Sequence, residues 1–185
     1  MIWILLAVLA VLVLWVIAAY NGLISLKNQA LNGWKQIDVQ LKRRHDLIPN
    51  LIETVKGVMK FEQSTLTQVI EARNKAISAQ GIAEKAEQEN MLTGALRQLF
   101  ALVENYPNLK SNENVTKLQE ELVSTENRIG FSRQFYNDIA TKFNIAQQVF
   151  PTNIIVGIFG FKAAELFEIT EPSEREVPKV DLNLK

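Results

Sequence analysis

One histidine and its neighbouring carboxylate are the residues whose pairing most suggests chemistry. His45 is the single histidine among 185 residues and is followed directly by Asp46. Such a pair could act as a general base with its orienting carboxylate, or supply part of an HD-type phosphohydrolase metal centre. That metal centre needs several converging histidines and carboxylates, and one imidazole cannot complete a catalytic zinc set. We therefore favour a structural interpretation, in which His45 lies solvated near the C-terminal dipole of one helix and Asp46 caps the next.

Motifs for other kinds of catalysis are missing from the sequence. Cysteine is absent, which excludes thiol nucleophiles, thiolate metal ligands and disulfides. No nucleophile elbow accompanies a serine, and no P-loop or GxGxxG loop occurs. The 20 basic side chains are balanced by 20 acidic ones, which argues against a strongly basic nucleic-acid binder. We expect no enzyme, no catalytic residue, no metal, no cofactor, no small-molecule substrate and no nucleic-acid partner.

The first 20 residues, MIWILLAVLAVLVLWVIAAY, are all hydrophobic. At 1.5 Å per residue such a helix spans about 30 Å, the thickness of a bilayer hydrocarbon core. A cleaved signal peptide is the alternative, but its apolar core would be shorter and a basic residue would precede it. We expect a retained single-pass anchor. Lys27 and Lys35 follow the span, which predicts a cytoplasmic domain.

The rest of the chain shows helical periodicity, and only 176–184 could hold a short strand. The anchor is predicted to continue as one helix to about Asp46, where a second helix begins with Pro49 in its first turn. Further helices are expected over about 82–105 and 113–149. The predicted fold class is all-α, with an N-terminal transmembrane helix continuing into an antiparallel four-helix bundle of coiled-coil character. The expected domains are an anchor (1–20), a bundle (21–150), and an apolar flap with an extended tail (151–185).

Charged residues interrupt the apolar stripes of the first two predicted helices. Arg44 stands in the stripe from Tyr20 to Ile48, and Glu62 and Arg73 stand in the stripe from Ile48 to Ala76. They form a buried ion-pair network, act as a switch, or lie at the stripe edge with the charge turned outward. We favour the edge interpretation.

Lys42, Arg43 and Arg44 form a basic cluster. In a continuous helix this cluster stands about 33 Å beyond Tyr20. The Debye length is about 8 Å at physiological salt, so the cluster is too far away to feel its own membrane. It is either a solvated helix end, which we favour, or a candidate docking patch for an acidic partner.

The octapeptide IIVGIFGF, residues 154–161, is uncharged and too short to cross a membrane. Tracing four antiparallel helices brings it back close to the bilayer. Three interpretations remain open: a cap over the end of the core, an interfacial wedge, or a contact with a neighbouring subunit. The candidate oligomer or membrane contacts are Ile154, Ile155, Val156, Ile158, Phe159 and Phe161.

Several segments together resemble the LemA family, and the resemblance covers essentially the whole chain. They are Trp34, the run IDVQLKRRHDLIPNL (37–51), ENRI (126–129), RQFYND (133–138) and FPTNIIVGIFGF (150–161). The resemblance implies a bacterial protein with an N-terminal membrane helix and a helical-bundle domain. It implies no enzyme chemistry and supplies no functional residues.

The leading hypothesis is a non-catalytic, membrane-anchored helical scaffold that self-associates or docks partners at the cytoplasmic membrane. Its expected partners are the lipid bilayer, further copies of the chain as a homo-oligomer, and a membrane protein. The alternative is a regulatory or sensing module that controls a membrane protease or kinase.

Overall fold

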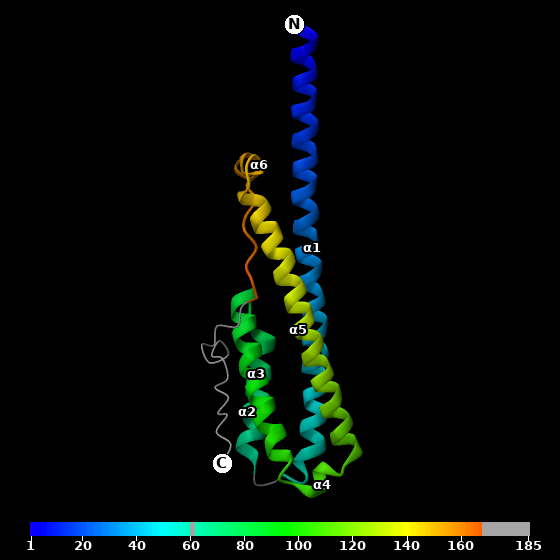
Figure 1. Ribbon diagram of the computed structural model, residues 1–185. Helices are drawn as coiled ribbons and strands as arrows, with labels where there is room; N and C mark the ends of the chain where they lie inside the picture. The colour runs from blue at the N-terminus through cyan, green and yellow to red at the C-terminus, as the bar shows by residue number, and fades with distance from the viewer. Residues whose placement is uncertain (60–61, 168–185) are drawn as a thin grey trace, which may run out of the picture.

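The computed structural model describes residues 1–59 and 62–167. Within these ranges every regular element is helical and no strand occurs, which confirms the all-α class. The helices are α1 (Ile2–Lys56), α2 (Gln63–Ser78), α3 (Ile82–Val103), α4 (Pro107–Lys110), α5 (Glu113–Gln148) and α6 (Thr152–Phe159). The chain descends along α1, returns along α2, descends along α3 and returns along α5 (Figure 1). The tail from residue 168, with its expected strand, lies outside the described residues.

α1 is one helix of 55 residues that passes the position of the predicted break. The expected N-cap at Asp46 is wrong, because Asp46 and Pro49 both lie inside α1. A proline at this position has no amide for the carbonyl four residues earlier, which belongs to His45. Arg73 of α2 replaces that donor, with its Nε donating to the His45 oxygen at 2.7 Å. The helix therefore continues through Pro49 with the freed carbonyl satisfied.

The second predicted stripe is shared between two helices. α1 ends at Lys56, Met59 is buried in the following turn, and α2 begins at Gln63. The apolar members of the stripe are buried on both sides of this turn, from Ile48 to Ala76. The pattern is thus confirmed, but the single helix predicted from it is not.

Two pairs of helices make up the packed part of the molecule. α5 runs antiparallel along α1, and α2 and α3 form a hairpin beside the end of that pair remote from the N-terminus (Figure 1). In that remote half, α1, α2, α3 and α5 share one buried cluster, which includes Ile48, Val69, Leu99 and Leu122. Nearer the N-terminus, the core consists of contacts such as that of Leu23 with Phe143, without the hairpin. A uniform four-helix bundle over 21–150 is therefore not confirmed.

α5 carries the clearest apolar pattern of the sequence. The Asn112 side chain caps it, because Oδ1 accepts hydrogen bonds from the amides of Asn114 and Val115 at 2.9 and 3.4 Å. The stripe then faces inward from Val115 to Phe143. Phe150, the last predicted member, follows the helix end and is 80% exposed.

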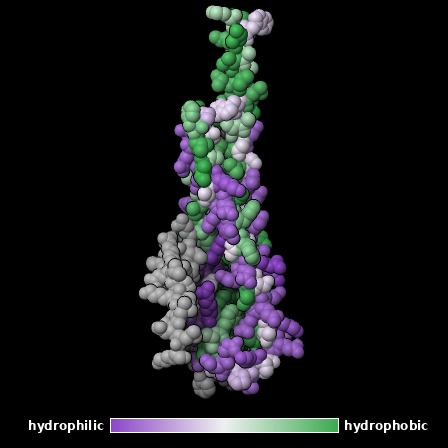
Figure 2. All heavy atoms as spheres, in the orientation of Figure 1, coloured by the Kyte–Doolittle hydropathy of each residue, from purple (hydrophilic) through white to green (hydrophobic). Residues whose placement is uncertain are grey.

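The N-terminal part of α1 is long and apolar enough to cross a membrane, and none of this stretch is buried within the molecule. Figure 2 shows hydrophobic residues along this free end. A helix that is hydrophobic all round must be buried in protein or in lipid. By length and composition this stretch is therefore a candidate membrane span.

Candidate functional site

The first candidate site is the end of the packed domain that adjoins the apolar part of α1. Beyond α5 a turn leads into α6, which is seen nearly end-on in Figure 1 while α1 stands upright, so the two helices cross. Ile155 of α6 is only 2% exposed and packs with Leu23 and Phe143. The ring of Phe159 lies 4.7 Å from that of Tyr20, centre to centre. α6 is thus fixed against α1 at the residue where the predicted anchor ends.

α6 has one side in the core and one side in the surroundings. Ile155 is buried, and Val156 and Phe161 are half-buried against the same cluster. Ile154, Ile158 and Phe159 are exposed, Ile158 by 72%. The six predicted contact residues are therefore divided between a cap over the core and an outward apolar surface. What this surface contacts stays a prediction.

Gly160 ends α6 and turns the chain back along α5. Its φ of 67° and ψ of 37° are in the left-handed region that a side chain disfavours. Residues 161–167, here called the strap, then follow without regular secondary structure. The part of α1 beyond Tyr20 and α5, which packs along it, are here called the arm. The turn therefore connects the outward apolar surface to a segment held on the arm.

Two asparagines of α5 hold the strap through its main chain. Asn144 accepts from the Ala164 amide at 2.8 Å and donates to the Ala164 carbonyl at 2.9 Å. Asn137 pairs in the same way with the amide and carbonyl of Phe167, at 2.8 and 3.0 Å. A side-chain amide offers both an acceptor and donors, so each asparagine satisfies both main-chain groups of one strap residue.

Phe167 anchors the end of the strap. Its ring is buried, lies 5.8 Å from the Trp34 ring and has the Arg133 guanidinium over its face at 4.5 Å. It belongs to a cluster that also contains Ala86 of α3. The strap thus bridges the α1–α5 pair and the start of the hairpin's second helix.

The second candidate site is a buried charge cluster between α1, α3 and α5. Arg44 of α1 is 1% exposed and forms ion pairs with Glu89 of α3 and Glu126 of α5. Its Nη1 also donates to the Thr93 hydroxyl at 2.9 Å. His45 Nε2 donates to the other Glu89 oxygen at 2.8 Å. The preferred edge interpretation of Arg44 is therefore wrong, and the buried-network alternative describes it.

The electrostatics of this cluster centre on Glu89. Burial by itself raises the pKa of the Glu89 carboxyl, but the His45 hydrogen bond and the Arg44 charge outweigh it, so the pKa is lowered from its ordinary value. Glu89 is therefore an ionised acceptor with fixed donors on both oxygens. Such a group holds helices together, since each of its oxygens already accepts a hydrogen bond from another helix.

The structure also corrects the prediction for His45. The residue is 9% exposed and lies inside α1, and it is not a solvated helix end. Within the described residues no group of three or more histidines and carboxylates could hold a metal ion. A cavity of about 160 Å³ lies beside Arg44 and Glu126, but His45 does not line it. The histidine thus acts as a structural donor to Glu89.

The basic cluster of Lys42, Arg43 and Arg44 is divided between buried and exposed side chains. Arg44 is buried and cannot belong to an accessible patch. Lys42 is exposed, and Arg43 is half-exposed and pairs with Glu121 of α5 at 3.0 Å. A docking role for Lys42 and Arg43 stays a prediction. Of the other two interrupting residues, Arg73 binds the His45 carbonyl, and Glu62 accepts from the Tyr106 hydroxyl at 3.3 Å.

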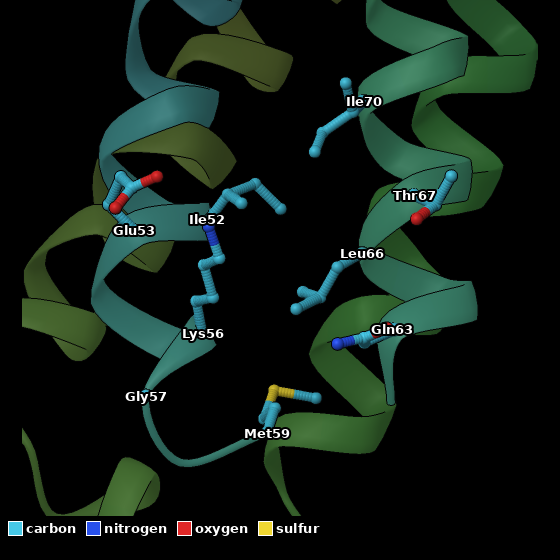
Figure 3. Close-up of a pocket in the computed structure, with 9 residues that line it drawn as sticks. All are labelled: Ile52, Glu53, Lys56, Gly57, Met59, Gln63, Leu66, Thr67 and Ile70. Carbon is cyan, nitrogen blue, oxygen red and sulfur yellow. The ribbon is translucent and has the colours of Figure 1, made fainter. Parts of the chain in front are cut away.

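An apolar groove separates α1 from α2 at the remote end of the molecule. It encloses about 840 Å³ between the end of α1 and the start of α2. Figure 3 shows Ile52 of α1 and Leu66 and Ile70 of α2 turned toward this space, with Met59 of the turn at its closed end. The hairpin therefore contacts α1 less closely than α5 does.

A comparison with known protein families identifies the family of this chain. The LemA family model matches residues 33–182. The chain belongs to the LemA family. The resemblance drawn from its sequence motifs is therefore confirmed.

Two kinds of named relatives are similar to this LemA-family chain. "Magnetosome protein MamQ 2" of Paramagnetospirillum magneticum is 26% identical over 80% of the chain, and "Magnetosome protein MamQ" of Magnetospirillum gryphiswaldense is 25% identical over 80%. "Protein LemA" of Metamycoplasma hominis is 26% identical over 88% of the chain and 73% of its own length. The chain spans 64% of the length of either magnetosome relative.

Some important side chains of this LemA-family protein escaped prediction. Glu89 has a usable signal, because it stands three residues after Ala86 and three before Leu92 in the buried stripe of α3. A carboxylate in one stripe and Arg44 in another would have suggested a buried pair. Asn137 and Asn144 have no such signal, since polar residues on a helix flank ordinarily face water.

Proposed function

We propose that this LemA-family protein is a non-catalytic, membrane-anchored scaffold that self-associates or docks partners at the cytoplasmic membrane. The unbroken α1 carries the proposal, because one helix contains both the apolar stretch and the long segment that packs against α5. From Tyr20 to Lys56 this helix extends about 54 Å. Such a rod holds the α2–α3 hairpin at a fixed distance from the bilayer.

The burial of the charge cluster around Glu89 supports a role without catalysis. Arg44 and Glu89 are buried and paired, and His45 donates to Glu89. A reaction would need groups that are free to exchange protons with a bound substrate. The protein then works through its shape and its surfaces.

Self-association is supported by apolar side chains exposed on the arm. Phe131 and Phe135, one turn apart on α5, are both exposed, Phe131 by 74%. Copies anchored in one membrane share their orientation. The same residues of two arms therefore lie at the same distance from the bilayer, and a two-fold contact can form between them. Exposed clusters of large apolar side chains are typical of such interfaces.

The mass of the full-length protein in mild detergent tests this proposal. We expect a defined homo-oligomer from the protein alone, and a smaller species from Phe131→Ser. Gln134→Ser on the exposed side of α5 is the matched control. A wild-type monomer that assembles only when a membrane protease or kinase is added would favour the regulatory alternative and contradict the scaffold.

A further inference from the structure

The outward side of α6 continues the exposed apolar surface of α1. Ile154, Ile158 and Phe159 are exposed on α6, and Ile17 is exposed on α1 one turn before Tyr20. Figure 2 shows hydrophobic residues both on the free end of the molecule and at the level of α6 below it. One environment that accepts both surfaces is the edge of a bilayer, where apolar side chains enter the acyl chains.

The first charge on each segment that leaves this surface is positive, and the acidic Glu165 follows Lys162 by three residues. No charged side chain occurs between Phe143 and Phe161, nor in α1 before Lys27. The first charged residues on the three segments that leave the apolar end are Lys27, Lys142 and Lys162, and all three are exposed. Each lies within four residues of a member of the Leu23 and Phe143 cluster. A collar of lysines below an apolar end suits the phosphates of anionic lipids.

We propose that α6 is an interfacial membrane helix that lies in the headgroup region of the bilayer that α1 crosses. Ile154, Ile158 and Phe159 enter the acyl boundary, and the three lysines bind anionic headgroups. The crossing of α6 over α1 gives the orientation that an interfacial helix requires. Ile155 and the strap hold this short helix in place before any lipid binds.

This inference rests on the proposed anchoring by residues 1–20, so the experiment must separate the two. The chain has no cysteine, so single cysteines carry a nitroxide label without background. Ile158→Cys tests α6, Leu12→Cys tests the span, and Val39→Cys, which is also exposed, tests the arm about 28 Å beyond Tyr20. The full-length protein is placed in vesicles of phosphatidylcholine with phosphatidylglycerol, and collisions with lipid-soluble oxygen and a water-soluble nickel complex are measured.

We expect the ratio of oxygen to nickel collisions at Ile158→Cys to exceed that at Val39→Cys about tenfold, with a still higher ratio at Leu12→Cys. A ratio at Ile158→Cys equal to that at Val39→Cys would overturn the inference about α6. If the Leu12→Cys label is buried in lipid in the same experiment, the proposed anchoring still stands. Spin coupling at Ile158→Cys that disappears on dilution with unlabelled chain would assign the surface to a neighbouring copy instead. A water-exposed Leu12→Cys label would refute the anchoring itself.

Lipid charge provides the second measurement. We expect the Ile158→Cys label to lie deeper in vesicles with phosphatidylglycerol than in phosphatidylcholine alone, and Lys142→Gln with Lys162→Gln to abolish this difference. An equal depth in both vesicles would overturn the role of the lysines. Circular dichroism shows whether each labelled protein keeps its helices, and Ile154→Cys replaces Ile158→Cys if that variant fails to fold.

Discussion

Arg73 of α2 donates its Nε hydrogen to the main-chain oxygen of His45, at 2.7 Å. This oxygen is the one that Pro49 leaves without a helical amide partner. The contact therefore supports the continuity of α1 and at the same time fastens the hairpin to it. A charge-assisted hydrogen bond is among the stronger ones in a protein, and this one is partly buried.

The first prediction concerns this pair. Arg73→Met should lower the free energy of unfolding by about 1–3 kcal/mol, because the His45 carbonyl loses its donor. Pro49→Ala restores a main-chain amide, so the same arginine change should cost less in that background. Urea unfolding of the four proteins, followed by circular dichroism, measures the difference. Equal losses in both backgrounds would show that Arg73 does not replace the missing amide.

Removal of one member of the buried cluster should be far more damaging than removal of a surface pair. Arg44→Met leaves Glu89 charged and buried, and we expect a loss of about 3–5 kcal/mol of stability. Arg43→Met, its neighbour in the half-exposed pair with Glu121, should cost less than about 1 kcal/mol. His45→Ala should lie between them, at about 1–3 kcal/mol, since it removes one donor to Glu89. Similar losses for the two arginine variants would contradict the buried network.

Stability should fall in acid partly through Glu89. Its native pKa is lowered from the ordinary value of 4.5 by His45 and Arg44, which outweigh burial. The native state therefore holds this proton less tightly than the unfolded chain does. The contribution is complete above about pH 4.5 and is lost as the pH falls through the native pKa. Unfolding free energies measured at several pH values should show a shallower acid decline for Glu89→Gln, and parallel curves would exclude this role.

The strap should open independently of the helices when its asparagine partners are removed. Asn137→Ala leaves the amide and carbonyl of Phe167 without their side-chain partners. We expect hydrogen exchange at the Phe167 amide to accelerate at least tenfold, while amides in the middle of α5 change little. Gln134→Ala on the exposed side of α5 is the control. Unchanged exchange at Phe167 would mean that its ring, with the Asn144 and Tyr136 contacts of the strap, holds this residue without Asn137.

Orientation across the membrane provides the last prediction. Lys27 and Lys35 follow the apolar stretch, which predicts that α2 to α5 lie on the cytoplasmic side. A cysteine at the exposed Lys117 should therefore resist an impermeant thiol reagent in intact cells and react after permeabilisation. Labelling in intact cells would show that the domain lies on the opposite side of the membrane.

The sequence by itself determined the features that depend on local spacing. Twenty hydrophobic residues define the apolar end of α1, because span length follows from helical rise alone. The inward positions of α5, such as Leu122, Ile129 and Phe143, follow from a three- and four-residue repeat. Both signals are contained within one helix, so no knowledge of neighbouring helices is needed to read them.

Only the tertiary structure decided the features that depend on partners distant in sequence. Pro49 reads as a helix start until Arg73 is seen to supply the donor that it lacks. Arg44 reads as a surface charge until Glu89 and Glu126 are seen around it, 45 and 82 residues away. Likewise, Asn137 gains its role from Phe167, which the strap returns to α5. The free energy of a buried polar group is set by the partner that it meets, and that partner is chosen by packing rather than by the local sequence.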